Sequence, residues 1–381
     1  MRVLIVGGGV AGLALAAMLA RQGREPVVAE RSGTYRDSGY GISLYPFGSA
    51  VLHGIGAYPG FAAASTELKT YEIAGPRGGV IRSIDFARLM SGHGPTYITA
   101  RSTLIGLLRA AGGERMDLRM GTTISTLREA GSQVEVSLSD GSDERFDLVV
   151  GCGGLHSPIR ELLFGPQPGV DTGWVGWTWW GQEGIFPPET ARELWLPGAF
   201  FGVYPIPGRA MYFVAVPSAA APADGRLTEA ETAARLRAAL GESAAIPEIR
   251  AALDEASRLW PWRLRDVRSR QLRKGRVVLC GDAGTAFLPT AGVGASAALR
   301  SAAALADELS RADARLVPLA LDHYLERTTK PTRAHQRDSR RLARAMLLQS
   351  SALCRGRDIA TRHMPTRLMI GSILAAMHER V

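Results

Sequence analysis

The chain has 381 residues, and 46% of them are apolar, which is enough for a large core and for two domains. With 21% charged residues and a mean hydropathy of +0.01, the composition excludes a disordered protein and a polytopic membrane protein. The formal net charge is +9. Arginines outnumber acidic residues between Pro331 and Val381, but no aromatic residues interleave them, so the sequence does not predict nucleic-acid binding.

Three cysteines, Cys152, Cys280 and Cys354, are too few for a disulfide scaffold, and none belongs to a CxxC pair. We therefore expect a reducing, cytoplasmic location. The uncharged stretch 3–20 superficially resembles a signal sequence or a membrane anchor. Because it begins almost at the first residue and contains several glycines, we expect two separate elements of a folded domain in its place.

The first of these elements is a β-branched run that predicts a buried parallel strand. It leads into a GxGxxG pattern at Gly7, Gly9 and Gly12, then an apolar helix pattern and a second strand that ends in Glu30. Gly7 suits a tight turn, Gly9 lets the backbone approach a pyrophosphate, and Gly12 permits close helix packing. Glu30 would accept hydrogen bonds from ribose hydroxyls. The unit predicts an adenine dinucleotide site without separating NAD from FAD, and a glycine-rich turn with no ligand is the alternative.

Alternation over 133–138, a turn at Asp140-Gly141 and a run over 145–150 predict a β-meander that ends on a glycine-rich loop. From about Val170, short aromatic strands with Pro and Gly turns predict an antiparallel sheet. Its aromatic side chains are interpreted either as the floor of a pocket for a flat substrate or as the core of that sheet. The aromatic residues of this region are Trp174, Trp177, Trp179, Trp180, Trp195, Phe200, Phe201, Tyr204, Tyr212 and Phe213.

Helices are predicted from Thr228 to Leu240, which opens on a capping box, and from Pro247 to Leu259. The buried strand pattern over 275–279 indicates that the chain then returns to the first domain. The remainder is predicted to be largely helical, with breaks at three prolines and a docked apolar helix over 368–377. These prolines are Pro318, Pro331 and Pro365.

A second cofactor signal follows the strand at 275–279. Gly281-Asp282 and the glycine-rich loop from Pro289 to Gly294 precede an Ala-rich helix that starts near Ala295. A carboxylate at Asp282 could hold ribityl hydroxyls, and the helix dipole could stabilise negative charge on an electron-accepting ring. Strand, acid, glycine loop and helix thus repeat the pattern of the first unit.

Four anchors occur in order along most of the chain. They are Gly7-x-Gly9-x-x-Gly12 with Glu30-Arg31, Gly41-Ile42-Ser43-Leu44-x-Pro46, Arg101-x-x-Leu104, and Gly281-Asp282 with Pro289-x-x-Gly292-x-Gly294. Together they resemble the single-component (group A) FAD-dependent monooxygenases of the para-hydroxybenzoate hydroxylase-like superfamily.

The resemblance implies an α/β fold with a Rossmann-like, GR2-type FAD-binding domain, an inserted antiparallel β-sheet substrate domain and a helical C-terminus. The expected boundaries are 1–70, 98–170 and 269–330 for the FAD-binding domain, 71–97 and 171–268 for the substrate domain, and 331–381 for the C-terminal helical segment.

The resemblance also implies how FAD is held. Its pyrophosphate lies at the first glycine turn and its ribose at Glu30, while Arg101 contacts the cofactor and Asp282 lies near the ribityl chain. The loop from Pro289 to Gly294 borders the isoalloxazine ring beside the substrate. The expected FAD-binding residues are Gly7, Gly9, Val10, Ala11, Gly12, Glu30, Arg31, Gly41, Arg101, Asp282, Pro289, Gly292, Val293, Gly294 and Ala295.

Three positions depart from the family pattern. Gly153 stands where the middle GADG motif has its aspartate, Thr285 where a histidine is usual, and Ser296 where asparagine is common. The middle aspartate is associated with flavin and nicotinamide binding, so the substitution at Gly153 puts NADPH-driven reduction in question more than FAD binding. NAD(P)H is expected as a transient reductant without a Rossmann domain of its own.

The resemblance implies an FAD-dependent monooxygenase that inserts one oxygen atom of O2, through a flavin C4a-hydroperoxide, into an aromatic or polyketide-like small molecule. The alternatives are an FAD-dependent reductase, oxidase or cyclase, a nicotinamide dehydrogenase that uses only the first unit, and a binding or scaffold protein. Halogenation is disfavoured because Trp177-Thr178-Trp179 matches only half of the halogenase WxWxIP motif. Scattered histidines predict no metal site. No catalytic base is assigned; candidates by region are Tyr45, Tyr204, Tyr212, Arg209 and His53.

Overall fold

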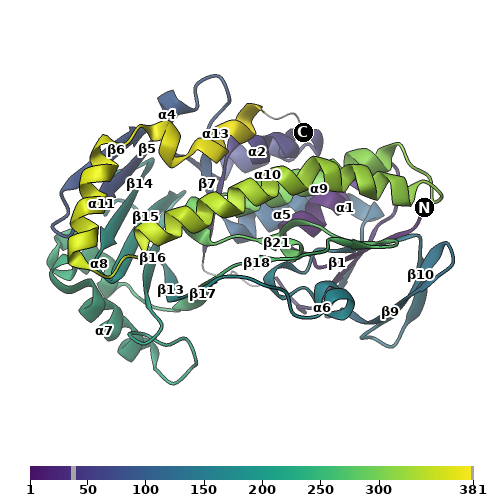
Figure 1. Ribbon diagram of the computed structural model, residues 1–381, viewed down its shortest axis with the longest axis horizontal. Helices are drawn as coiled ribbons and strands as arrows, with labels where there is room; N and C mark the ends of the chain where they lie inside the picture. Colours follow the sequence, from purple (N-terminus) through teal and green to yellow (C-terminus); the bar gives the residue numbers. More distant parts are fainter. Residues whose placement is uncertain (36–39, 379–381) are drawn as a thin grey trace.

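The computed structural model describes residues 1–35 and 40–378. Two sheets form the two halves of the molecule, and the long helix α10 (Val317–Met346) runs along both of them (Figure 1). The N-terminal end of α10 packs in the core of the half that contains β1, through Val317 and Tyr324. Its C-terminal Met346 packs against the sheet of the other half. The helix therefore fixes one half relative to the other.

The first half is built on a six-stranded sheet of order β19-β20-β12-β1-β2-β8. All neighbouring pairs are parallel except β19 with β20. The strands are β1 (Val3–Val6), β2 (Val27–Glu30), β8 (Asp117–Met120), β12 (Leu148–Gly151), β19 (Arg273–Lys274) and β20 (Val277–Leu279). The three parallel strands predicted from apolar runs are confirmed, with ends that differ by one or two residues.

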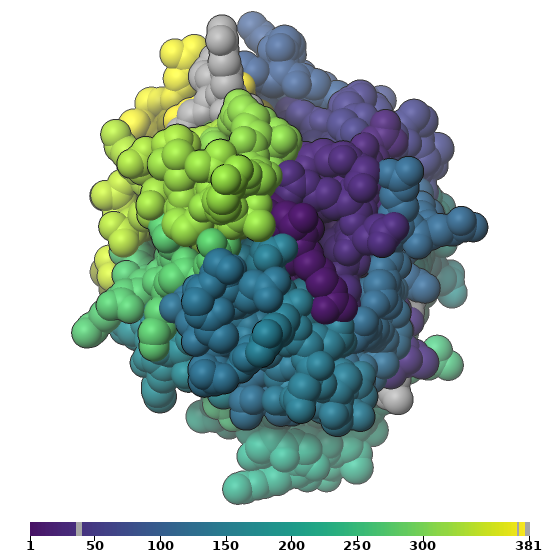
Figure 2. Space-filling model, turned by 90° about the vertical axis from the view of Figure 1, so that its right-hand side faces the viewer, coloured from purple at the N-terminus to yellow at the C-terminus, as the bar shows by residue number. Residues whose placement is uncertain are grey.

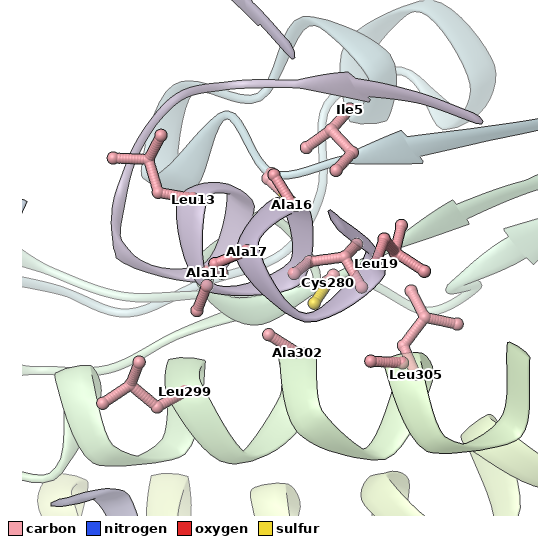
Figure 3. Packing of buried hydrophobic residues seen from close by; sticks show 14 of the residues in the cluster. Ile5, Ala11, Leu13, Ala16, Ala17, Leu19, Cys280, Leu299, Ala302 and Leu305 are labelled. Atoms are coloured by element: carbon pink, nitrogen blue, oxygen red, sulfur yellow. The ribbon is translucent and has the colours of Figure 1, made fainter. Parts of the chain in front are cut away.

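Helices α1 (Val10–Arg21), α5 (Arg101–Gly112) and α9 (Gly294–Ser310) cover one face of this sheet. Leu299, Ala302 and Leu305 of α9 project toward α1 (Figure 3). Small side chains such as Ala17 and Ala302 let these two helices approach closely, which brings the two predicted cofactor junctions to the same edge of the sheet.

The other face carries a small antiparallel sheet, β9 (Ile124–Ala130), β10 (Gln133–Leu138) and β11 (Asp143–Phe146), with helix α6 (Pro158–Phe164). The meander is thus confirmed for its hairpin, but the predicted strand 145–150 is wrong. The chain leaves the small sheet at Phe146, and β12 enters the central sheet between β1 and β20. Figure 2 shows this end of the molecule, where the N-terminal residues, the small sheet and the α9–α10 turn meet.

The second half is built on a seven-stranded sheet of order β17-β13-β16-β15-β14-β5-β6. Every pair is antiparallel except β5 with β14, a parallel pair that was not predicted. The strands are β5 (Thr70–Ala74), β6 (Val80–Asp85), β13 (Asp171–Gly181), β14 (Thr190–Leu196), β15 (Ala199–Ile206), β16 (Arg209–Pro217) and β17 (Trp260–Arg265). Helices α7 (Glu229–Leu240) and α8 (Pro247–Asp254) cover one face.

The predicted helix over 247–259 is wrong at its C-terminal end, because α8 stops at Asp254 and Trp260 already belongs to β17. The remaining strands and α-helices before α9 are short. They are β3 (Gly41–Leu44), β4 (Thr66–Glu67), β7 (Tyr97–Ala100), β18 (Val267–Arg268), β21 (Thr285–Ala286), α2 (Pro46–Gly54), α3 (Tyr58–Ala63) and α4 (Phe86–Leu89).

The C-terminal part is helical: after α10 come α11 (Ser351–His363), α12 (Thr366–Met369) and α13 (Gly371–His378). The predicted break at Pro331 is wrong, because this residue lies inside α10. Contacts on both sides of the proline hold the helix: Tyr324 Oη donates to Leu279 O at 3.2 Å, and the Gln336 amide donates to Val267 O and Ala286 O. The predicted docked helix over 368–377 is confirmed only for its second part. The stretch divides at Ile370 into α12 and α13, and Leu368 is exposed whereas Ile373 of α13 is buried.

Across the described residues, no helix is both long and apolar enough to span a bilayer.

Candidate active site

A cavity of about 1650 Å³ lies where the two halves meet. Both glycine junctions of the six-stranded sheet border it, and so does one face of the seven-stranded sheet. Of the residues predicted to bind FAD, it is lined by Gly7, Gly9, Val10, Ala11, Glu30, Arg31, Gly41, Arg101, Asp282, Pro289, Gly292, Gly294 and Ala295. The fold therefore brings together residues that are far apart in the sequence.

The first junction is shaped by its glycines. Gly7 has a φ of +118°, and a Cβ on it would lie 2.5 Å from the carbonyl carbon of Cys152. A Cβ on Gly12 would overlap the carbonyl oxygen of Gly7, so Gly12 serves helix–strand packing and does not line the cavity. A Cβ on Gly9 would meet no atom within 4 Å. Gly9 caps α1 without a side-chain hydrogen bond, which leaves N–H groups of the first turn open to an anion.

Glu30, at the end of β2, is held by two backbone donors. Its Oε2 accepts from Gly8 N at 2.7 Å, and its Oε1 accepts from Ser32 N at 2.8 Å. Each carboxylate oxygen can accept a further hydrogen bond. The side chain is thus oriented at the rim of the first junction, where a ribose would follow the pyrophosphate.

The second junction begins at Gly281, which has a φ of +61°. Asp282 borders the cavity, but its Oδ1 is buried and accepts no hydrogen bond from the residues that the structure describes. This burial raises the pKa of Asp282 to about 7. A buried carboxylate oxygen without a donor costs free energy, so the site suits a ligand that brings hydroxyl groups.

The loop from Pro289 to Gly294 contacts the β3 anchor. Tyr45 Oη donates to Ala291 O at 3.2 Å, and Tyr45 N donates to Ser296 Oγ at 3.0 Å. Ser296 thus takes part in joining α9 to α2. Val293 is 1% exposed and packs in an apolar cluster, so it does not line the cavity as the other loop residues do. Near the β3 anchor, Arg101 lies with its guanidinium 5.7 Å from the ring centre of Tyr40.

Alternation along the strands divides the aromatic residues between two faces of the seven-stranded sheet. Trp177, Trp179 and Tyr212 pack against α7 and α8 and form core. Trp195, Phe200, Tyr204 and Phe213 line the cavity. The core interpretation therefore holds for one face of the sheet, and the other face borders the cavity.

Among the candidates for substrate activation, Tyr45 and Tyr204 line the cavity. Tyr212 does not, because it faces the α7–α8 core. Arg209 lies outside the lining, over the Trp180 ring at 3.8 Å, and His53 stacks on Tyr58.

The cavity contains one feature not predicted from the sequence, a buried carboxyl group at Glu193 on β14. Tyr204 Oη donates to its Oε1 at 2.6 Å, Trp195 Nε1 donates to its Oε2 at 2.9 Å, and Tyr71 Oη also donates to Oε2. Burial raises the pKa of Glu193, while these hydrogen bonds act in the opposite direction. The alternation of 191–195 could have indicated its face, but not the partner on β5.

The glycine that replaces the family aspartate has a local reason. A Cβ on Gly153 would lie 2.8 Å from Pro158 Cδ and 3.0 Å from Ser157 Cα. Next to it, buried Arg160 donates to Ala283 O at 3.0 Å and so ties this loop to the second junction. A side chain at 153 would therefore require residues 157–158 to shift.

The chain matches the family model described as FAD binding domain over residues 1–336. It belongs to this family. The relatives are consistent with this assignment: "Aurachin C monooxygenase/isomerase" of Stigmatella aurantiaca is 33% identical over 330 residues, which is 84% of this chain and 83% of that protein. The "3-amino-4-hydroxybenzoate 2-monooxygenase" of Streptomyces cremeus is 30% identical over 376 residues, 94% of this chain and 90% of that protein.

Among solved structures, Klebsiella pneumoniae HpxO complexed with FAD and uric acid has the same fold, with a TM-score of 0.88 and 21% identity, and covers 99% of this chain and 96% of its own. The protein is thus a single-component FAD-dependent monooxygenase of the para-hydroxybenzoate hydroxylase-like superfamily, with NAD(P)H as the reductant usual for that family. The unpartnered Asp282 oxygen and the open N–H groups beside Gly9 fit its cofactor.

Proposed function

We propose that this monooxygenase hydroxylates a planar aromatic small molecule, bound between the loop at 289–294 and the cavity face of the seven-stranded sheet. The observation that supports this most directly is the continuity of one cavity from the glycine junctions to the aromatic side chains of β14–β16. Relatives are named for oxygenation of an aminohydroxybenzoate and for synthesis of a quinolone, both aromatic. A polyketide-like aromatic substrate belongs to the same chemical class.

We propose the following roles for the FAD-binding residues. N–H groups at Val10 and Ala11 hold the pyrophosphate, since the start of α1 carries partial positive charge. Glu30 accepts from the ribose, and Asp282 accepts from the ribityl chain. We also propose that the domain boundaries are those given in the sequence analysis. Arg31, Gly41 and Arg101 are proposed to contact FAD.

Bound FAD supplies the activation of O2, and the chain supplies binding, orientation and exclusion of water. Tyr45 holds the 289–294 loop through Ala291 and so sets the position of the loop beside the ring. The aromatic side chains of β14–β16 would align a flat substrate and keep the reaction volume poor in water. The three cysteines are free, which supports a cytoplasmic location.

The test begins with purified protein, in which FAD content is measured by absorbance. NADPH oxidation and O2 uptake are then followed with a panel of hydroxylated aromatic and heteroaromatic compounds. We expect substrate-stimulated NADPH oxidation and one atom of 18O from 18O2 in the product. Tyr212→Phe is a suitable control, because it alters a tyrosine on the face of the sheet away from the cavity.

Gly153 gives the second candidate function a specific basis, since it lacks the carboxylate that the resembled family has at this position and that is associated with nicotinamide binding. Flavin reduction is therefore also followed without O2. Reduction by NADPH with product formation but no 18O incorporation would contradict the hydroxylase and favour a reductase or cyclase.

A further inference from the structure

One buried carboxyl group lies on the aromatic face of the cavity, and the proposed chemistry does not use it. Glu193 is 4% exposed and borders the cavity from the middle of β14. Its backbone pairs with Ile73 of β5 and Gly202 of β15. Tyr71 and Tyr204 lie on these same neighbouring strands and reach the carboxyl group from either side. Glu193 is thus placed in the sheet that forms the substrate end of the cavity.

The Glu193 carboxyl group is held by three hydrogen bonds and can accept a further one. Oε2 accepts from Tyr71 and Trp195, whereas Oε1 accepts only from Tyr204 among the hydrogen bonds of the described residues. Since a carboxylate has about four acceptor positions, Oε1 can take a further donor. The neighbouring Arg192 forms its ion pair with Glu72, and the three donors to Glu193 among residues 1–35 and 40–378 are all neutral.

Gly202 explains how this geometry is possible. A Cβ on Gly202 would lie 2.9 Å from Tyr204 Cε2 and Oη, so the tyrosine ring lies directly over the glycine. In the next strand, Met211 pairs with Tyr204, and its Sδ lies 2.7 Å from Gly41 N of the β3 anchor. The hydrogen-bonded group around Glu193 therefore adjoins the residues proposed to hold the flavin.

We propose that Glu193 is the polar recognition group of the substrate site, where it accepts a hydrogen bond from an N–H or O–H of a planar aromatic substrate. The same carboxyl group disfavours substrates that place a carboxylate there. This inference rests on the proposed function and gives it a substrate class: neutral aromatic or heteroaromatic molecules with a ring-borne donor. The physical reason is that a donor fills the remaining acceptor position of a buried, preorganised carboxyl group, whereas a second negative charge would be repelled.

The test measures ligand affinity of the FAD-loaded protein from the change in flavin absorbance. Two matched pairs differ only in the donor: 4(1H)-quinolone with its N-methyl derivative, and 2-naphthol with 2-methoxynaphthalene. 2-Naphthoate tests the effect of a carboxylate. In the wild type, we expect the donor member of each pair to bind about tenfold more tightly or better, in line with hydrogen bonds to charged groups. 2-Naphthoate should bind more weakly than 2-naphthol by a similar factor.

Two variants separate recognition from structure. Glu193→Gln keeps an acceptor but removes the charge, so the donor preference should fall to about threefold or less and the discrimination against 2-naphthoate should shrink. Tyr212→Phe changes the opposite face of the same sheet and should keep the wild-type ratios. A purely structural role for Glu193 would lower all affinities together and leave the ratios unchanged.

Equal affinities within both pairs in the wild type would overturn the inference, as would failure of every donor probe to bind. Unchanged ratios in Glu193→Gln would also overturn it. If this variant does not fold, the wild-type ratios and the 2-naphthoate comparison still decide. A chain that takes up no FAD would refute the proposed function itself, and the absorbance spectrum reports that before any probe is added.

Discussion

Replacing Asp282 with asparagine should change how the stability of the flavin-free protein depends on pH. Asp282 Oδ1 is buried without a hydrogen-bond donor in the part of the chain that the structure describes, and burial raises the pKa of this carboxyl to about 7 from the ordinary 3.8. The pKa of Asp282 is higher in the folded state than in the unfolded state. The stabilisation of the folded state by protonated Asp282, relative to the ionised form, is therefore complete below about pH 4. It is lost as the pH rises toward 7, because the folded protein then holds an uncompensated buried charge.

The magnitude follows from the two pKa values. At about 1.4 kcal/mol for each pH unit, a pKa near 7 in place of 3.8 corresponds to roughly 4 kcal/mol of unfolding free energy lost on ionisation. Because Asp282 borders the cavity, water there reduces this cost, and 4 kcal/mol is an upper value. Between pH 5 and pH 8, the wild type should lose about 2–3 kcal/mol relative to Asp282→Asn.

The assay is urea unfolding of the flavin-free wild type and Asp282→Asn at several pH values, with the difference in unfolding free energy plotted against pH. Taking the difference cancels groups that titrate alike in both proteins. FAD affinity provides the complementary measurement: if ribityl hydroxyls donate to the carboxylate, wild-type affinity should rise with pH up to about 7. A difference curve that stays flat from pH 5 to pH 8 would refute the assigned ionisation of Asp282.

Three further predictions concern the first glycine turn and the helix α10. Gly12→Ala should destabilise the protein by about 3 kcal/mol, since its Cβ would overlap Gly7 O, whereas Gly9→Ala should leave thermal unfolding unchanged and weaken FAD binding; calorimetry and flavin titration distinguish them. Arg340→Ala should cost about 3–5 kcal/mol in urea unfolding, because it removes the guanidinium that binds the fully buried Asp266 carboxylate at 2.6 and 2.9 Å and leaves that charge with the Val170 N–H donor; loss under 1 kcal/mol would contradict this. Pro331→Ala should raise the unfolding free energy by roughly 2 kcal/mol, because a proline inside α10 donates no helix hydrogen bond. An unfolding free energy below that of the wild type would show that the helix needs the proline.

The two glycine junctions could be predicted from the sequence because their constraint is local. The turn at Gly7 and the packing at Gly12 each need a residue without a side chain, and such needs appear as a fixed spacing. That both junctions line one cavity depends on α1 packing against α9, which no local pattern contains. The resemblance to a known family supplied this long-range information. It did not distinguish the residues that line the cavity from Gly12 and Val293, which support the loops from outside the cavity.

Local rules failed where tertiary contacts outweighed them. Pro331 predicts a break, but Tyr324 and Gln336 fix α10 on either side of it. The run 145–150 looks like one strand, yet its two ends pair with different sheets. Strands that pair in a sheet can be far apart in the sequence. A period-two pattern within one strand therefore does not identify the strand with which it pairs.

Glu193 illustrates the same limit at the candidate site. An acid in a strand, here between Arg192 and Leu194, is usually interpreted as a solvent-facing residue of an amphipathic sheet. Here both faces are covered, one by α7 and α8 and the other by the cavity and α10, so the acid is buried on whichever face it occupies. Its donor Tyr71 is 122 residues away in sequence. Substitutions on the Trp179 face should therefore alter stability, whereas those on the Glu193 face should alter which substrate is accepted.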